Sequence, residues 1–75
     1  MIAMETLNDI HIFKTNINKP DLAEIHRIFD RAGITRWTVD MEDCDLVLRV
    51  VSDQWSENEI GLLVSQHGFL CAPLP

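Results

Sequence analysis

The chain has 75 residues, of which 47% are hydrophobic and 24% charged, and its formal net charge is −6. This length fits one domain with a small core, and the composition argues against wholesale disorder. The negative charge repels phosphate backbones and anionic lipid, so nucleic acid and membrane surfaces are poor candidate partners.

The termini and cysteines indicate the compartment. No apolar run approaches the roughly 20 residues that cross a bilayer. Residues 1–9 carry neither a basic segment nor a long apolar stretch, unlike a secretory signal. We therefore expect a cytoplasmic protein in which residues 1–9 form a loose lead-in and 10–75 a single domain. The two cysteines are too few for a disulfide framework and are expected to be reduced thiols.

The first half of the domain reads as a strand followed by a helix. The segment "IHIFK" (residues 10–14) is short, β-branched and aromatic, which is typical of a strand. Asn18 is placed to cap a helix, and Pro20 fits its first turn because no N–H is needed there. An apolar stripe at spacings of three and four follows, and Gly33 is expected to end the helix: Leu22, Ile25, Ile28, Phe29 and Ala32.

The second half reads as a hairpin, a helix and a last strand. Residues 34–40 and 46–51 alternate between polar and apolar positions, and the short polar link 41–45 predicts an antiparallel pair. Ser56 and Glu59 form a capping-box pattern that opens a second helix, which Gly68 ends. Residues 69–72, "FLCA", are expected to form a final short strand.

This element order predicts an α+β fold of the ferredoxin-like βαββαβ type. We expect a four-stranded antiparallel sheet in the order 4-1-3-2, with both helices on one face.

Two segments carry a resemblance to a known family. "GITRWTVDMEDC" and "IGLLVSQHGF" are similar to the Gly-Val-x-x-Val-x-Val-Asp-Leu and Ile-x-x-Ala-Gly-Tyr stretches of the heavy-metal-associated domain. The pattern resembles this family, to which small copper chaperones and the N-terminal modules of metal-pumping ATPases belong, over nearly all of residues 10–71. These are scaffold features, so the resemblance implies the fold more than a function.

The family's metal motif is absent from this chain. The resemblance implies Met-x-Cys-x-x-Cys between the first strand and first helix, where two thiolates hold a soft ion such as Cu(I). Here that loop reads "KTNINKPDL" and contains no sulfur donor. Inherited copper transfer is therefore not expected, and no cofactor is indicated.

A relocated metal site is the alternative. The expected topology brings Cys44, His67 and Cys71 to one end of the domain, with the carboxylates of "DMEDCD" (residues 40–45), and such groups suit Zn²⁺ if they converge. Their spacing matches no recognised ligand pattern. Cys71 also reads as a core residue and His67 as a helix C-terminal residue.

Catalysis is not indicated. A Cys44–His67 pair is conceivable, but the carboxylates beside Cys44 disfavour its thiolate. There is no Gly-rich phosphate loop and no Ser-His-Asp arrangement, so we do not expect an enzyme.

Interaction through the uncovered face of the sheet remains. Strand alternation places seven side chains there, although Phe13 could instead turn inward: His11, Phe13, Arg36, Thr38, Val47, Arg49 and Val51. We expect Phe13, Val47 and Val51 to form an apolar patch flanked by Arg36 and Arg49. Trp37 reads as core, whereas Trp55 fits either a hydrophobic staple against Ile60 or an exposed anchor.

The sequence therefore favours a non-catalytic module that works through protein contacts, with the divergent metal binder as the alternative. The partner could be a second copy, bound through the open face or the two edge strands, or a basic protein.

Overall fold

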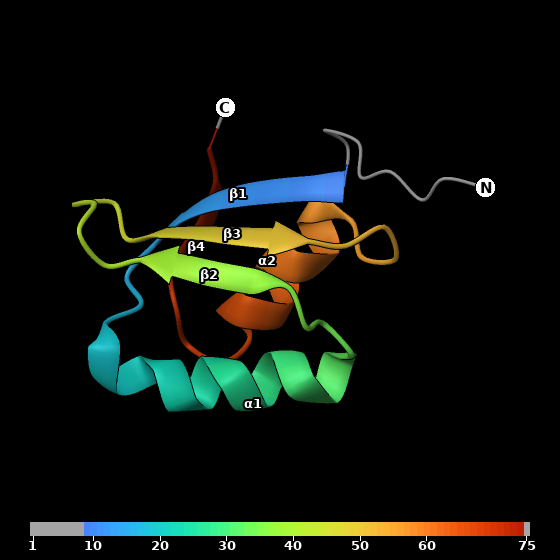
Figure 1. Ribbon diagram of the computed structural model, residues 1–75, viewed down its shortest axis with the longest axis horizontal. Helices are drawn as coiled ribbons and strands as arrows, with labels where there is room; N and C mark the ends of the chain where they lie inside the picture. Colours follow the sequence, from blue (N-terminus) through green and yellow to red (C-terminus); the bar gives the residue numbers. More distant parts are fainter. Residues whose placement is uncertain (1–8, 75) are drawn as a thin grey trace.

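The computed structural model describes residues 9–74, which form four strands and two α-helices (Figure 1). In chain order the elements are β1 (Ile10–Thr15), the 3-10 turn η2 (Lys19–Asp21), α1 (Leu22–Ala32), β2 (Trp37–Asp40), β3 (Val47–Val51), α2 (Glu57–Ser65) and β4 (Cys71–Pro73). Within this segment neither helix has the length and apolar character needed to cross a membrane. Residues 1–8 of the expected lead-in lie outside the residues that the structure describes.

The end of α1 and the start of α2 lie where the local chemistry predicts. The expected end of α2 at Gly68 is corrected to Ser65, because residues 66–68 form a turn whose N–H groups, those of His67 and Gly68, donate to carbonyls three residues back. α1 stops at Gly33, whose φ of 77° is the left-handed conformation that glycine adopts without a Cβ penalty. At the start of α2, the Ser56 hydroxyl accepts from the Glu59 N–H at 3.1 Å, and the Glu59 carboxylate accepts from the Ser56 N–H at 2.9 Å. The predicted capping box is confirmed, and it satisfies two N–H groups that a helix start leaves unpaired.

The sheet is fully antiparallel, in the order β2-β3-β1-β4. Read from the other edge this is β4-β1-β3-β2. The central pair, β1 and β3, aligns Ile12 with Arg49 and Phe13 with Leu48. β2 aligns Thr38 with the same Arg49, so Arg49 has a cross-strand neighbour on both sides.

One face of the sheet holds the core, and both helices contribute to it. Phe13 and Leu48 are fully buried from the strands, as are Phe29 from α1 and Ile60 from α2. The remaining buried apolar side chains belong to the same cluster: Ile17, Ile25, Ile28, Ile34, Val50 and Val64. Trp37 lies against this cluster as expected, with its ring 5.3 Å from that of Phe29 in an edge-on geometry.

The register corrects the expected orientation of β1. Residues directly opposite one another in an antiparallel pair point to the same face. His11 is opposite Val50 and Phe13 is opposite Leu48, both of which are buried, so His11 and Phe13 lie on the core face. Their expected place on the open face is therefore wrong. That face instead receives Ile10, Ile12 and Lys14.

Two expected strands are shifted. Residues 34–36 are not strand, because Ile34 turns into the core and its N–H donates to the Phe29 carbonyl at 2.8 Å. The last strand begins at Cys71 rather than at residue 69 and ends at Pro73.

The proline sits on the outer edge of β4. The Leu74 N–H donates to the Ile12 carbonyl at 2.9 Å, so Leu74 directs its backbone groups toward β1. Neighbouring residues of an antiparallel strand direct these groups in opposite directions. The nitrogen of Pro73 therefore points away from the sheet, where it offers no N–H.

Candidate functional site

The loop after β1, which the sequence shows to contain no sulfur donor, is held in place by protein groups. The Thr15 side chain is buried; its hydroxyl donates to the Leu46 carbonyl at 2.6 Å and accepts from the Ile17 N–H at 3.2 Å. The Ile17 side chain is fully buried in the core. The Asn16 side-chain oxygen accepts from the Leu70 N–H at 2.8 Å. The loop is therefore fixed to the rest of the domain by these hydrogen bonds and by the burial of the Ile17 side chain.

Asn18 occupies the expected cap position, but its backbone N–H rather than its side chain makes the hydrogen bond at this cap. It precedes η2, and its N–H donates to the Asp21 carboxylate at 2.9 Å. Its side-chain amide donates to the Asn16 carbonyl at 3.4 Å. The helix start is therefore organised by Asp21 as well as by Asn18, and α1 itself begins at Leu22.

The three candidate metal ligands do not come together. The connections between β2 and β3 and between α2 and β4 do lie near the loop after β1, as the hydrogen bonds of Thr15 and Asn16 show. Within residues 9–74, however, the only group of three or more potential ligands is Asp43, Cys44 and Asp45, which excludes His67 and Cys71. The exposed ring of His67 instead donates from Nδ1 to the Leu63 carbonyl at 2.9 Å.

The two cysteines occupy different environments. Cys44 is exposed in the acidic turn, where Asp43 and Asp45 flank it. Cys71 is half-buried against the core, and this burial raises its pKa from 9.0 to about 11. A thiol with a raised pKa is a poor nucleophile near neutral pH, so Cys71 acts as a small apolar side chain.

Trp55 is neither free nor fully enclosed. It packs partly against the core, and its indole N–H donates to the Ala32 carbonyl at 3.2 Å. That carbonyl belongs to the last turn of α1, where carbonyls lack a helical partner. Trp55 therefore ties the connection before α2 to the end of α1, a role that neither sequence interpretation included.

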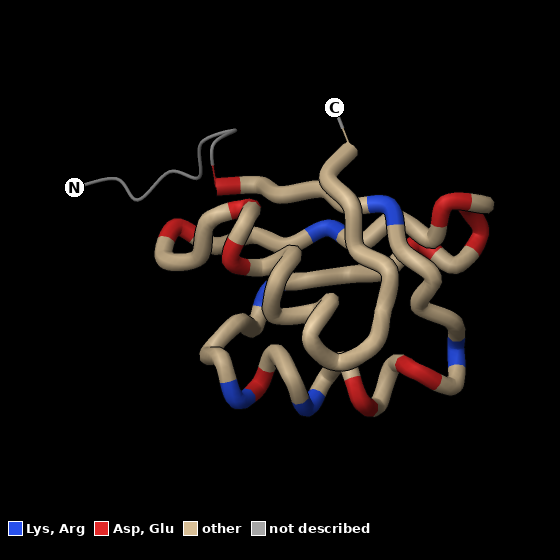
Figure 2. The backbone as a smooth tube through the Cα atoms, turned by 180° about the vertical axis from the view of Figure 1, so that it is seen from behind, with Lys and Arg blue, Asp and Glu red and all other residues tan. Residues whose placement is uncertain are grey.

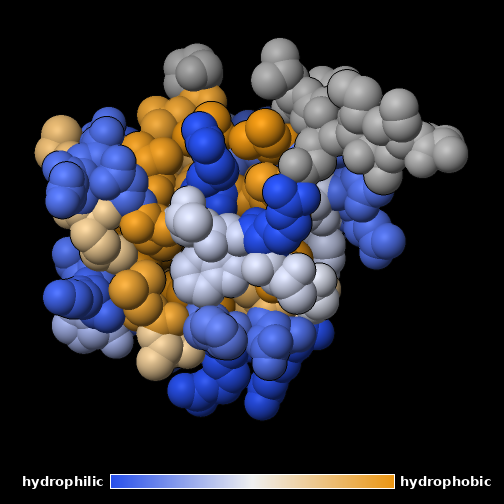
Figure 3. All heavy atoms as spheres, in the orientation of Figure 1, coloured by the Kyte–Doolittle hydropathy of each residue, from blue (hydrophilic) through white to orange (hydrophobic). Residues whose placement is uncertain are grey.

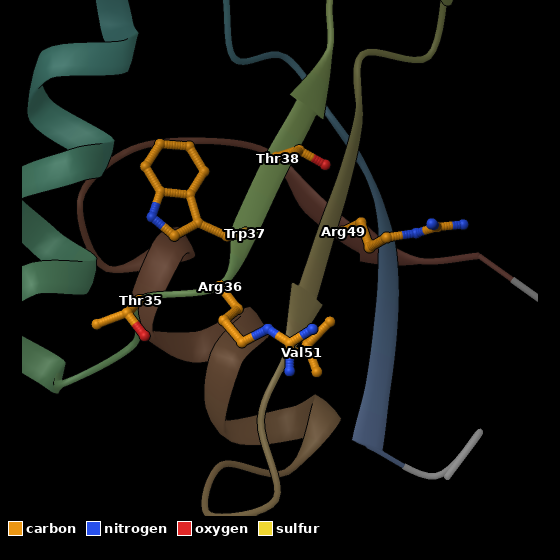
Figure 4. A pocket seen from close by; sticks show the side chains of 6 residues that line it. All are labelled: Thr35, Arg36, Trp37, Thr38, Arg49 and Val51. Atoms are coloured by element: carbon orange, nitrogen blue, oxygen red, sulfur yellow. The ribbon is translucent and has the colours of Figure 1, made fainter. Parts of the chain in front are cut away.

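The open face of the sheet carries a shallow hollow of about 430 Å³ (Figure 4). It is lined by Thr35, Arg36, Trp37, Thr38, Arg49 and Val51. Trp37 points toward α1, whereas the Arg36 side chain runs to Val51 and Arg49 extends across the neighbouring strand. Four of the expected surface residues, Arg36, Val47, Arg49 and Val51, thus lie on the open face.

Apolar and basic groups share this face. Ile10, Ile12, Val47 and Val51 are half-buried there, and Arg49 is exposed between them. Figure 3 shows hydrophobic surface over the strands interrupted by strongly hydrophilic groups. Figure 2 shows acidic residues on the loops at both ends of the sheet and basic residues on the strands between them.

Sequence reasoning did not place Ile10 and Ile12 on this face. The signal was present, because Lys14 shares their parity and a lysine in a strand faces solvent.

Comparisons of the chain with protein-family models, curated proteins and solved structures give no match.

Proposed function

We propose that this chain is a ferredoxin-like domain of the heavy-metal-associated type that has no metal ligands in its first loop and works through protein contacts. The βαββαβ element order and the antiparallel sheet with both helices packed on one face support the fold assignment. The loop network around Thr15 and Asn16 supports the loss of metal transfer, because its polar groups already have protein partners. The proposed compartment is the cytoplasm.

The open face is the observation that carries the proposed function. It combines half-buried aliphatic side chains with a hollow bordered by Arg36 and Arg49. Apolar surface with arginine at its centre is the composition that protein interfaces favour, since arginine contributes both stacking area and directional donors. No catalytic step is part of the proposal.

Site-specific photo-cross-linking in cells tests this function. A photoreactive phenylalanine analogue at Thr38, in the open face, is expected to join the protein to a defined partner. The same group at Arg27, exposed on α1, is the matched control. Equal labelling from both positions, or none from Thr38, would refute contact through this face.

The divergent metal binder predicts a different result. Native mass spectrometry of the reduced protein with Cu(I) and with Zn²⁺ is expected to show no adduct above the nonspecific background. One tightly held ion per chain, lost in the double variant Cys44→Ser and Cys71→Ser, would instead establish that alternative.

A further inference from the structure

The open face has a charge opposite to that of the whole chain. Three of the six Lys and Arg residues lie on it, Lys14, Arg36 and Arg49, although the formal net charge is −6. Asp40, opposite Val47, is the acidic residue on the strand positions of this face. A local positive field on an acidic protein selects the sign of what can bind there.

Arg49 is the centre of this positive region. Ile12 faces it from β1 and Thr38 from β2. Within residues 9–74 no hydrogen bond or ion pair joins its guanidinium to another group, whereas Lys14 lies 3.8 Å from the Asp45 carboxylate. An exposed guanidinium held on a strand among aliphatic side chains is a ready donor for a carboxylate.

Arg36 is diagonal to Arg49 across the β2–β3 pair. The Val51 N–H donates to the Arg36 carbonyl at 2.9 Å, which places Arg36 opposite Val51, two residues from Arg49. Diagonal positions are separated by roughly 7–8 Å. Alternate residues of an extended peptide are about 6.6 Å apart, so two carboxylates at positions i and i+2 match the two arginines.

Other occupants fit less well. A second copy placed face to face about an axis through the hollow would bring Arg36 and Arg49 against the same two arginines, and like charges at an interface cost affinity. A nucleic acid would place further phosphates beside the acidic loops at both ends of the sheet (Figure 2). A short acidic segment avoids both penalties.

We infer that the open face binds an extended acidic segment of a partner protein, with carboxylates at i and i+2 on Arg36 and Arg49 and an apolar side chain against Ile12 and Val51. This inference rests on the proposed function and adds the chemistry of the partner. It also reverses the sign expected from the sequence, in which an acidic domain suggested a basic partner.

Titration of the ¹⁵N-labelled protein followed by NMR tests the inference. The probe is a blocked peptide Glu-Ser-Glu-Ser-Leu-Ser-Leu, and its counterpart carries Lys in place of Glu. We expect the acidic peptide alone to shift amide signals of β2, β3 and β1. Arg49→Glu is expected to weaken binding about tenfold, because a charge-assisted hydrogen bond is lost and a like charge introduced. Arg49→Lys should retain part of the affinity.

Arg27→Glu is the matched control, since Arg27 is exposed on α1, away from the face, and carries the same change of charge. Its affinity is expected to equal that of the unmodified chain. The inference is overturned by equal binding of both peptides, by stronger binding of oligothymidylate, by shifts confined to α2 or the acidic turn, or by no shifts at all.

The cross-linking experiment separates this inference from the proposed function. A cross-link from Thr38 to a basic or neutral segment, or to a second copy, would overturn the acidic partner and leave protein contact through the face intact. Peptide binding without any cross-linked partner would instead show that the face can bind an acidic segment and would refute protein contact through the face in cells.

Discussion

The buried hydroxyl of Thr15 gives the sharpest test of how the first loop is held. Thr15→Val replaces the hydroxyl by a methyl group of similar size and leaves the β-branched shape unchanged. The side chain is 4% exposed, so the substitution changes hydrogen bonding more than packing.

The cost follows from the two bonds that are lost. The Leu46 carbonyl loses its donor at 2.6 Å, and the Ile17 N–H loses its acceptor at 3.2 Å. Each buried group left unsatisfied costs about 1–3 kcal/mol. The bond to Leu46 is only part-buried, so its loss costs about 1 kcal/mol, whereas the buried Ile17 N–H costs about 2 kcal/mol. The new methyl group returns about 1 kcal/mol by burial, so the free energy of unfolding should fall by about 2 kcal/mol. For a domain of this size that lowers Tm by about 8–16 °C.

Urea unfolding followed by tryptophan fluorescence measures this change, since Trp37 and Trp55 both pack partly against the core. Thr38→Val is the control, because Thr38 is exposed in the open face. It should shift the free energy of unfolding by less than about 0.5 kcal/mol. Equal effects of the two substitutions would show that the Thr15 hydroxyl does not hold the loop.

Three further substitution sets test other parts of the fold. Gly33→Ala should destabilise the domain by about 1 kcal/mol, because φ at residue 33 is 77°. Gly61→Ala should stabilise it by up to about 1 kcal/mol, since the new Cβ would meet Phe13 at an ordinary 3.8 Å. Calorimetry measures the sign of each change in stability. Ser56→Ala should cost about 1 kcal/mol through the lost cap, with reduced α2 protection in hydrogen exchange as the readout. A disulfide reagent should label exposed Cys44 quickly and Cys71 slowly, because a pKa of about 11 rather than 9.0 lowers the thiolate fraction about a hundredfold near neutral pH. Rapid labelling of a Cys44→Ser variant would contradict this burial.

The raised pKa of Cys71 also sets a pH dependence. The unfolded thiol ionises near 9.0, while the folded thiol keeps its proton to about 11. Between these values the unfolded state binds fewer protons, so stability falls as the pH rises. Cys71→Ala should remove this part of the alkaline destabilisation.

Local signals predicted the parts of the fold that local chemistry determines. Gly33 and the Ser56–Glu59 pair fix helix ends through bonds within a few residues, and both are where the sequence indicates. β1 was harder, because apolar residues occupy both parities of "IHIFK". Its orientation is set by pairing with residues about forty positions away, such as Leu48 and Val50, and the apolar residues of the strand by themselves do not contain that information.

The candidate site shows the same division. Arg36, Arg49 and Val51 were assigned to the open face because the hairpin alternates cleanly. The face of Ile12 was indicated only by the parity that it shares with Lys14. The indole bond from Trp55 to Ala32 depends on a tertiary contact that the sequence does not reveal.

The proline at the outer side of β4 limits how copies of this chain can join. Strand addition needs N–H donors along the free edge, and Pro73 removes one from a strand of only 3 residues. Any growth by backbone pairing would have to use β2 at the opposite edge. With a single usable edge, two molecules can pair once through β2, and the resulting sheet then ends in β4 on both sides. Pairing through strand edges would therefore terminate at the dimer.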